Sequence, residues 1–189
     1  MHEGTIGLWT SESLAVFRLN TRGPQILIGS SMGAWIALRM IEELATAGES
    51  VRVAGLVLIA PAPDFTCDLI EPNLTEARQR QLAEQGWFEE GSDYLEVPNR
   101  FSRAFLDDGR ENRVMGKIIE THCPVHVLQG MQDADVPYRH ALKLAAHLPK
   151  DSVTVGLIPD GDHRLSRPQD LKMLEDAVKS MLARCGSGA

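Results

Sequence analysis

Four short apolar runs, separated by amphipathic stretches, organise this chain. The runs are continuous rather than alternating, are rich in Val, Ile and Leu, and end close to Gly or Pro. Strands that are buried on both faces of a parallel sheet have this pattern. The sequence therefore predicts strands over residues 25–28, 53–60, 125–128 and 153–158.

Apolar residues between the runs recur with helical spacing. In the last stretch, Leu171, Leu174, Val178 and Met181 form one stripe, and Pro168 suits the first turn of a helix. The alternation of strands and helices predicts an α/β fold with a parallel sheet flanked by helices. We expect the helices over residues 5–20, 33–47, 138–148 and 168–184.

One long segment, residues 61–122, interrupts this alternation. It is rich in Pro, Glu, Asp, Arg and Gln, and at about 60 residues it is too long for a plain loop. We interpret it as a cap inserted into a single α/β domain over residues 1–189. Its apolar residues either pack the cap onto the core, which is the simpler interpretation, or line an acyl-chain channel. They are Leu74, Ala77, Leu82, Trp87, Phe88, Tyr94, Phe101, Phe105 and Leu106.

Charge and cysteine content narrow the class of protein. Lys and Arg number 19 against 26 Asp and Glu, a net charge of −7, so the chain lacks the basic surface that nucleic-acid binding requires. No apolar run approaches the ~18 residues of a membrane-spanning helix, and we read no secretory signal in the first residues. Three widely spaced cysteines, Cys67, Cys123 and Cys185, predict neither a disulfide framework nor a CxxC zinc site. We expect a cytoplasmic protein.

The motif that carries the chemistry is G-x-S-x-G at residues 29–33, between the strand over 25–28 and the helix over 33–47. A serine on such a tight turn has a strained backbone, so we expect small residues two positions before and after it. The turn raises the Ser31 hydroxyl above the carboxyl edge of the sheet. The backbone N–H of Met32 is then placed to donate to an oxyanion. The alternative is a purely structural turn, which the position between strand and helix disfavours.

A nucleophilic serine needs a base and a carboxylate that orients the base. Asp133 and Asp135 both follow the strand over 125–128, and either can be the orienting acid. Asp133 is nearer to the strand end and is preferred, because Asp135 is also explained as a turn residue that caps the next helix.

His163 follows the strand over 153–158 and is the preferred base. The order Ser, Asp, His is the order found in α/β folds with this turn. The other histidines lie at the terminus, in a strand, on a helix or at the end of the cap: His2, His126, His140, His147 and His122.

No cofactor or metal is predicted. His163 with Asp160 and Asp162 lacks the second His–carboxylate group that would complete a metal site. Residues 29–33 lack both the lysine of a P-loop and the third glycine of a dinucleotide-binding turn.

Three segments resemble those of α/β-hydrolases: Gly29-Ser-Ser-Met-Gly-Ala-Trp, Gly130-Met-Gln-Asp-Ala-Asp-Val-Pro and Gly161-Asp-His-Arg-Leu. Within that superfamily the chain resembles the mitochondrial abhydrolase-domain palmitoyl-protein thioesterases, also described as mycophenolic acid acyl-glucuronide esterases, and their bacterial relatives. The resemblance runs from about Gly4 to Met181. It implies a serine hydrolase of acyl esters or thioesters, small-molecule or acyl-protein, without a cofactor. It places the nucleophile on Ser31, the acid on Asp133 and the base on His163.

The resemblance also implies that about four further strands precede residue 25 in family members. We therefore expect an N-terminally truncated domain, with strand 25–28 as an exposed edge open to self-association. The loop that supplies a second oxyanion donor in the family would be missing, a loss of about 10²–10³ in rate. The alternative to an active hydrolase is a catalytically weak fragment that acts as an interaction module or needs association to fold.

Overall fold

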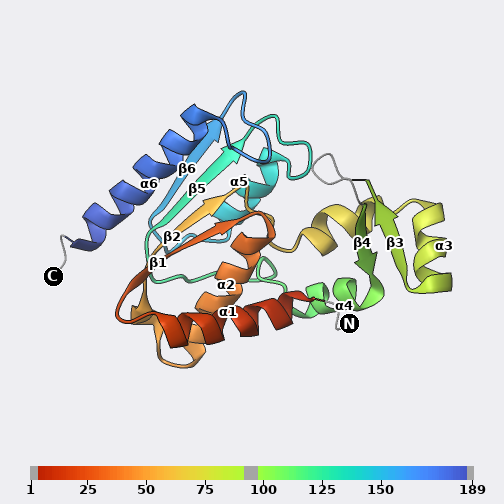
Figure 1. Cartoon of the computed structure of the whole chain (residues 1–189), viewed down its shortest axis with the longest axis horizontal. Coiled ribbons are helices and arrows are strands. Elements are labelled where there is room, and N and C mark those ends of the chain that lie inside the picture. Colours follow the sequence, from red (N-terminus) through yellow and green to blue (C-terminus); the bar gives the residue numbers. More distant parts are fainter. Residues whose placement is uncertain (1–3, 92–97, 187–189) are drawn as a thin grey trace. The chain divides into compact units, whose positions relative to one another are not determined.

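The chain forms two compact units in a computed structural model that describes residues 4–91 and 98–186 (Figure 1). The sheet unit comprises Thr10–Pro63 and Val114–Ala189. The cap unit comprises Met1–Trp9 and Asp64–Arg113. The predicted inserted segment, 61–122, is therefore longer than the part found in the cap unit. Its two ends, residues 61–63 and 114–122, belong to the sheet unit.

The sheet unit is built on four parallel strands in the order β1-β2-β5-β6. Their bounds confirm the four predicted strands: β1 Gln25–Ser30, β2 Val53–Ile59, β5 Val125–Gly130 and β6 Val153–Ile158. Leu56, Val57 and Leu58 are each 0% exposed, so both faces of β2 are covered. Because all four strands run the same way, the residues that follow them emerge at one edge of the sheet.

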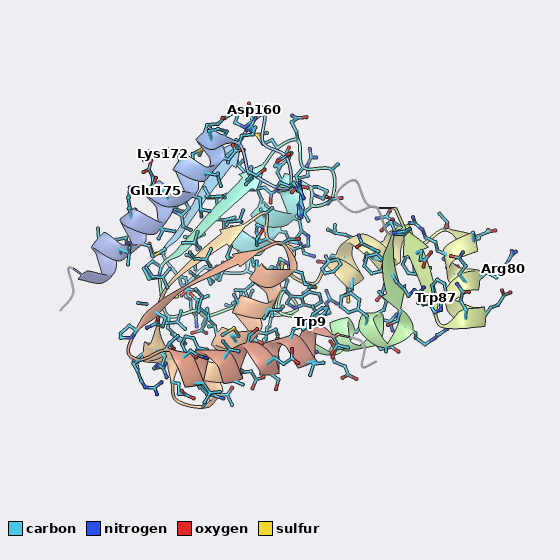
Figure 2. All side chains as sticks on the ribbon, in the orientation of Figure 1. Trp9, Arg80, Trp87, Asp160, Lys172 and Glu175 are labelled. Atoms are coloured by element: carbon cyan, nitrogen blue, oxygen red, sulfur yellow. The ribbon has the colours of Figure 1, made fainter. Side chains whose placement is uncertain are left out.

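The predicted helices flank this sheet and confirm the α/β fold. α6 covers one face and α2 the other (Figure 1). On the α6 side, Met181 and Ala177 join a buried cluster with Val57. Lys172 and Glu175 point away from the sheet on the outer side of α6 (Figure 2). The helices are α1 Ile6–Asn20, α2 Met32–Thr46, α5 Tyr138–Ala146 and α6 Pro168–Gly186, and a short 3₁₀ turn precedes β2 at Ser50–Arg52.

The cap unit has helices and a two-stranded antiparallel sheet of its own. Its aromatic side chains contact one another: the ring centroids of Phe88 and Phe101 are 5.4 Å apart, and those of Trp9 and Phe105 are 6.0 Å apart. Tyr94 lies outside the described residues. The elements are a π-helical turn at Thr66–Ile70, a 3₁₀ turn at Glu71–Asn73, α3 Glu76–Gln85, β3 Trp87–Glu90, β4 Asn99–Ser102 and α4 Arg103–Glu111.

None of the helices in the described part of the chain is both long and apolar enough to cross a membrane.

Candidate active site

Ser31 occupies a strained turn between β1 and α2. Its backbone has φ 52° and ψ −120°, a conformation that residues with a side chain rarely adopt. The strain is held by backbone hydrogen bonds: the Ser31 N–H donates to the carbonyl of Ile59 at 2.8 Å, and the Ser31 carbonyl accepts from the N–H groups of Ala34 at 3.0 Å and Ala62 at 3.2 Å. The turn places the Ser31 hydroxyl at the carboxyl edge of the sheet.

The two glycines of the motif differ in their surroundings. A Cβ on Gly29 would lie 2.5 Å from the carbonyl oxygen of Gly33 and 2.8 Å from the Cα of Ala34. A Cβ on Gly33 would meet nothing within 4 Å. The expectation of a small residue on both sides of Ser31 therefore has a steric basis at Gly29 and none at Gly33.

His163 lies in the loop after β6 and bridges the other two predicted residues. Its Nε2 is 3.0 Å from Ser31 Oγ, and its Nδ1 is 2.8 Å from Asp133 Oδ2. Because Asp133 is an acceptor, the Nδ1 of His163 carries the proton, and the Nε2 of the neutral ring accepts the hydroxyl proton of Ser31. The structure thus brings Ser31, Asp133 and His163 together.

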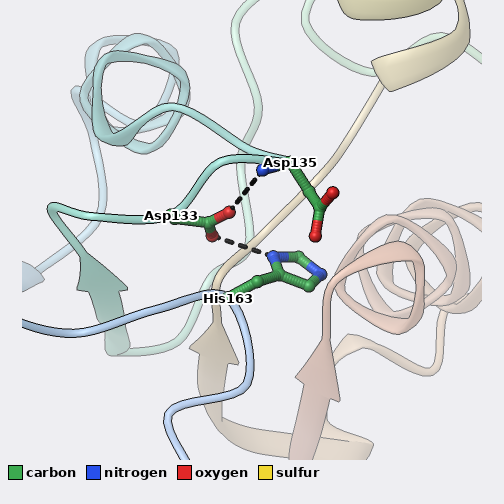
Figure 3. Close-up of side chains that lie close together, drawn as sticks. All are labelled: Asp133, Asp135 and His163. Carbon is green, nitrogen blue, oxygen red and sulfur yellow. Dashed lines mark hydrogen bonds and ion pairs between the residues drawn. The ribbon is translucent and has the colours of Figure 1, made fainter. Parts of the chain in front are cut away.

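Four donors surround the Asp133 carboxylate, whose side chain is 0% exposed. Its Oδ1 accepts the backbone N–H groups of Asp135 at 2.9 Å and Val136 at 2.8 Å. Its Oδ2 accepts His163 Nδ1 and, at 3.0 Å, Gln129 Nε2. Asp135, the alternative acid, contributes its backbone N–H to Asp133 (Figure 3).

The loops that carry the acid and the base touch at two glycines. A Cβ on Gly130 would overlap the carbonyl oxygen of Gly161 and lie 2.5 Å from that of Asp162. A Cβ on Gly161 would lie 3.0 Å from the Cα of Gly130. The Met131 N–H donates to the carbonyl of Ile158 at 2.9 Å. The backbones of the two loops are therefore in direct contact.

Arg167 closes the loop that holds His163. Its guanidinium donates to Asp160 at 2.7 and 3.2 Å, and to the two oxygens of the buried Asp170 at 2.8 Å each. Paired bonds of this kind fix direction as well as distance. The ends of the segment 160–170 are thus tied together by one side chain.

Opposing effects set the pKa of Asp133. Burial disfavours the charged carboxylate and raises its pKa, while the hydrogen bonds from His163, Val136 and Gln129 favour the charged form. The hydrogen bonds prevail, and the pKa of Asp133 lies below its ordinary value.

The pKa of His163 is shifted in the opposite direction. The hydrogen bond to Asp133 raises it, burial of the ring opposes this, and the charges of Asp133, Asp135 and Asp162 add to the increase. The net pKa of His163 lies above its ordinary value.

Asp133, Asp135 and His163 also form a group that could hold a metal ion, since their ligand atoms all lie within 4.8 Å of one another. This group differs from the one considered from the sequence, which consists of His163, Asp160 and Asp162. Both oxygens of Asp133 and the Nδ1 of His163 already take part in hydrogen bonds within the site. We therefore read these atoms as a hydrogen-bonded chain.

Two of the other histidines, His140 and His147, each lie within hydrogen-bond distance of a backbone carbonyl. His140 is buried and its Nε2 is 2.7 Å from the carbonyl of Pro63, while His147 Nδ1 is 3.0 Å from that of Lys117. Sequence reasoning missed two residues that support the site, Gln129 and Arg167. Gln129 had one visible signal, a polar residue adjoining an apolar run.

Most of the chain matches one protein family. Residues 8–172 match the alpha/beta hydrolase family. The chain belongs to this family.

Two solved structures are similar to the chain over most of its length. A putative hydrolase from Agrobacterium vitis S4 is 57% identical, with a TM-score of 0.90, over 94% of this chain and 69% of that one. The alpha/beta hydrolase domain-containing protein 10 from mouse is 28% identical, with a TM-score of 0.82, over 96% of this chain and 71% of that one.

Among curated proteins, the chain is similar to the mitochondrial palmitoyl-protein thioesterase ABHD10 of Mus musculus. The two are 30% identical over 181 residues, which cover 95% of this chain and 59% of the relative. The chain therefore spans less than two thirds of the length of this curated relative.

Proposed function

We propose that this alpha/beta hydrolase is a serine hydrolase that cleaves carboxylic esters or thioesters through an acyl-enzyme. One observation carries the proposal. Ser31 Oγ, His163 Nε2, His163 Nδ1 and Asp133 Oδ2 form a continuous hydrogen-bonded chain, with 3.0 Å and 2.8 Å between its members, at one edge of a parallel sheet. This is the arrangement that activates a serine hydroxyl as a nucleophile.

In the acylation half-reaction, Ser31 Oγ attacks the substrate carbonyl carbon while its proton passes to His163 Nε2. The carbonyl oxygen becomes an oxyanion, and the Met32 N–H is the donor we assign to it. Met32 lies in the first turn of α2, where a backbone N–H has no acceptor within the helix. The tetrahedral intermediate collapses when His163 returns the proton to the leaving oxygen or sulfur.

In the deacylation half-reaction, water attacks the acyl-serine and gives a proton to His163 Nε2. A second tetrahedral intermediate collapses, the proton returns to Ser31 Oγ, and the carboxylic acid leaves. Throughout, Asp133 keeps the proton of the imidazole on Nδ1 and stabilises the imidazolium. The low pKa of Asp133 supports this role, since a carboxylate that stays ionised is required.

The substrate class follows from the relatives and is part of the proposal. The mouse relative is named a palmitoyl-protein thioesterase, so a long-chain acyl thioester is the first substrate to assay. The oxyester of the same acyl chain is the matched comparison, because it changes only the leaving atom. A rate on either substrate fits a serine hydrolase.

The decisive experiment is labelling with a fluorophosphonate probe, read by peptide mass spectrometry. We expect the wild type to be labelled at Ser31, and hydrolysis and labelling to be lost in Ser31→Ala. Ser30→Ala is the matched control, since Ser30 is the exposed neighbour in the same turn and should keep both. Labelling that persists in Ser31→Ala, or a folded wild type that is neither labelled nor active, contradicts the proposal.

The same experiment addresses the alternative of a catalytically weak fragment that acts as an interaction module. A folded protein without turnover would favour that alternative, and an active monomer would exclude it. A cytoplasmic location remains a prediction that fractionation of the source cells can test. The mouse relative is named as mitochondrial.

A further inference from the structure

A fully buried glutamine lies beside the acid. Gln129 is the penultimate residue of β5, and it is 0% exposed. The other residues of this strand are predominantly apolar, and a leucine would fill a covered strand position without a polar group to desolvate. The amide of Gln129 therefore needs an explanation other than filling space.

The explanation lies in its nitrogen. Gln129 Nε2 lies 3.0 Å from the carbonyl of Gly130, 3.0 Å from Asp133 Oδ2 and 3.1 Å from the carbonyl of Val136. All three partners are acceptors, which fixes the orientation of the amide with its nitrogen toward them. One side chain thus joins both ends of the loop 130–136 to the carboxylate that lies between them.

The oxygen of the same amide has no hydrogen-bond partner among the residues that the structure describes. A buried acceptor without a donor destabilises a protein, and native structures contain few of them. In Gln129, Oε1 stays without a donor while Nε2 contacts three acceptors. This asymmetry indicates that the contacts of Nε2, one of which is to Asp133, are the feature that matters.

We propose that Gln129 is a positioning residue for the acid of the hydrolase. It acts through Asp133, and the inference rests on the proposed function. Gln129 Nε2 and His163 Nδ1 donate to the same oxygen, Oδ2, so Gln129 fixes the point at which the imidazole is held. Gln129 also keeps Asp133 ionised when His163 becomes charged, because a donor to the carboxylate favours its charged form.

A role limited to closing the loop predicts different behaviour, and two substitutions separate the roles. Gln129→Met has a similar length and no donor. We expect kcat/KM to fall by about ten- to a hundredfold, mainly in kcat, with a parallel fall in the rate of fluorophosphonate labelling. Gln25→Met is the matched control, because Gln25 Nε2 also donates to three loop carbonyls, at 2.8, 3.0 and 3.4 Å, at the opposite end of β1. It should keep the wild-type rate.

Gln129→Glu gives the sharper result. A protonated Glu offers one O–H donor to Asp133, whereas an ionised Glu places a second negative charge against it. At pH values where His163 is neutral, we expect the rate of the variant relative to the wild type to fall as pH rises, which gives a descending limb that the wild type lacks. A pH profile of the same shape as that of the wild type contradicts a role through Asp133.

The wild type supplies a measurement that does not depend on the folding of any variant. In a pH titration followed by ¹⁵N NMR, the side-chain amide of Gln129 should shift with the midpoint of His163, and that of Gln25 should not. A Gln129 amide that does not respond overturns the inference.

If the wild type is labelled at Ser31 while Gln129→Met keeps its full rate, the inference fails and the proposed function stands. If the wild type is not labelled, the proposed function fails.

Discussion

Two aspartates, Asp133 and Asp135, separated by one alanine, have different surroundings in this molecule. Asp133 is turned inward, where the backbone N–H groups of Asp135 and Val136 bind its Oδ1 and leave Oδ2 toward the imidazole. Asp135 is exposed at the same loop. A carboxylate that receives backbone donors two and three residues later forms a local turn, and this turn selects which aspartate faces His163.

The first prediction separates the two aspartates. Asp133→Asn should lower kcat by as much as about 10⁴-fold, because an amide favours the wrong imidazole tautomer. Asp135→Asn should change it by less than about tenfold, because the variant keeps the backbone N–H that binds Asp133 and loses only an exposed charge. Steady-state hydrolysis of one ester by the three proteins measures both effects. Equal losses in the two variants would contradict the assignment of the acid.

The second prediction concerns pH. His163 must be neutral to accept a proton, and its raised pKa means that kcat/KM falls on the acid side at a pH above the ordinary histidine value of about 6.5. Asp135→Asn removes one of the charges that raise the pKa of His163, so the acid limb should move to lower pH. The charges of Asp133 and Asp162 also raise the pKa of His163, so part of the shift is retained.

Asp176→Asn serves as the control for this profile, because Asp176 is an exposed residue on α6 whose side chain pairs with Lys172. A limb that stays in place in Asp135→Asn, or that moves equally in the control, counts against the prediction. Measurements at two salt concentrations add a check, since the contribution of an exposed charge is screened by salt.

His163 and Asp133 contribute to the stability of the folded protein in different pH ranges. The pKa of His163 is raised on folding, so its contribution is fully present below the unfolded pKa and is lost as pH rises through the folded pKa. The pKa of Asp133 is lowered, so its contribution is present above the unfolded pKa and is lost as pH falls through the folded pKa.

Among the elements, the turn between β1 and α2 leaves no room for a side chain at Gly29. Gly29 faces the backbone of the first helical turn, and Gly33 faces open space. The third prediction follows from this difference. Gly29→Ala should lose activity and about 1–3 kcal/mol of stability, because the methyl group would overlap fixed backbone atoms. Gly33→Ala should keep activity and gain up to about 1 kcal/mol, because alanine favours a helix.

Urea unfolding and fluorophosphonate labelling of the two variants test this prediction together. The pair is matched, since each adds one methyl group within the same motif. A tolerated Gly29→Ala would show that the turn relaxes without loss, and a damaging Gly33→Ala would show that the second glycine is needed for another reason.

For the whole molecule, the sequence predicted the main architecture because the buried sheet leaves a strong pattern. Strands covered on both faces give continuous apolar runs, as at Leu56, Val57 and Leu58, and each predicted site residue follows such a run. The placement of Ser31, Asp133 and His163 near one another was predictable because parallel strands end at one edge.

Other features leave a weaker pattern in the sequence. The apolar run predicts a strand that ends at residue 128, before Gln129. Only the register of β5 with β6, which pairs Gln129 with Leu157, places Gln129 within the sheet. The four-residue strands of the cap unit are too short for alternation to identify. The membership of Trp9 in that unit depends on a tertiary contact with Phe105, which no local pattern encodes.

The fourth prediction concerns association of whole molecules. Within the described residues, β1 pairs on one side only, with β2, and Ile28 on it is 52% exposed. We propose that a protein of this sequence associates with itself through this edge.

Sedimentation should show a mass that rises with concentration, and Ile28→Lys should reduce this rise by placing a charge on the strand. Ile118→Lys is the control, since Ile118 is 51% exposed and lies outside the strands. A wild type that stays monomeric at high concentration contradicts the proposal.

The contact between Gly130 and Gly161 has a consequence for redesign. A methyl group on Gly130 would overlap the backbone of the histidine loop, and one on Gly161 would lie 3.0 Å from the Cα of Gly130. The shapes of the two loops are therefore matched to each other. Saturation mutagenesis at either position would yield few useful clones. A chimera that imports the acid segment from a homologue would need to import the histidine segment from the same donor.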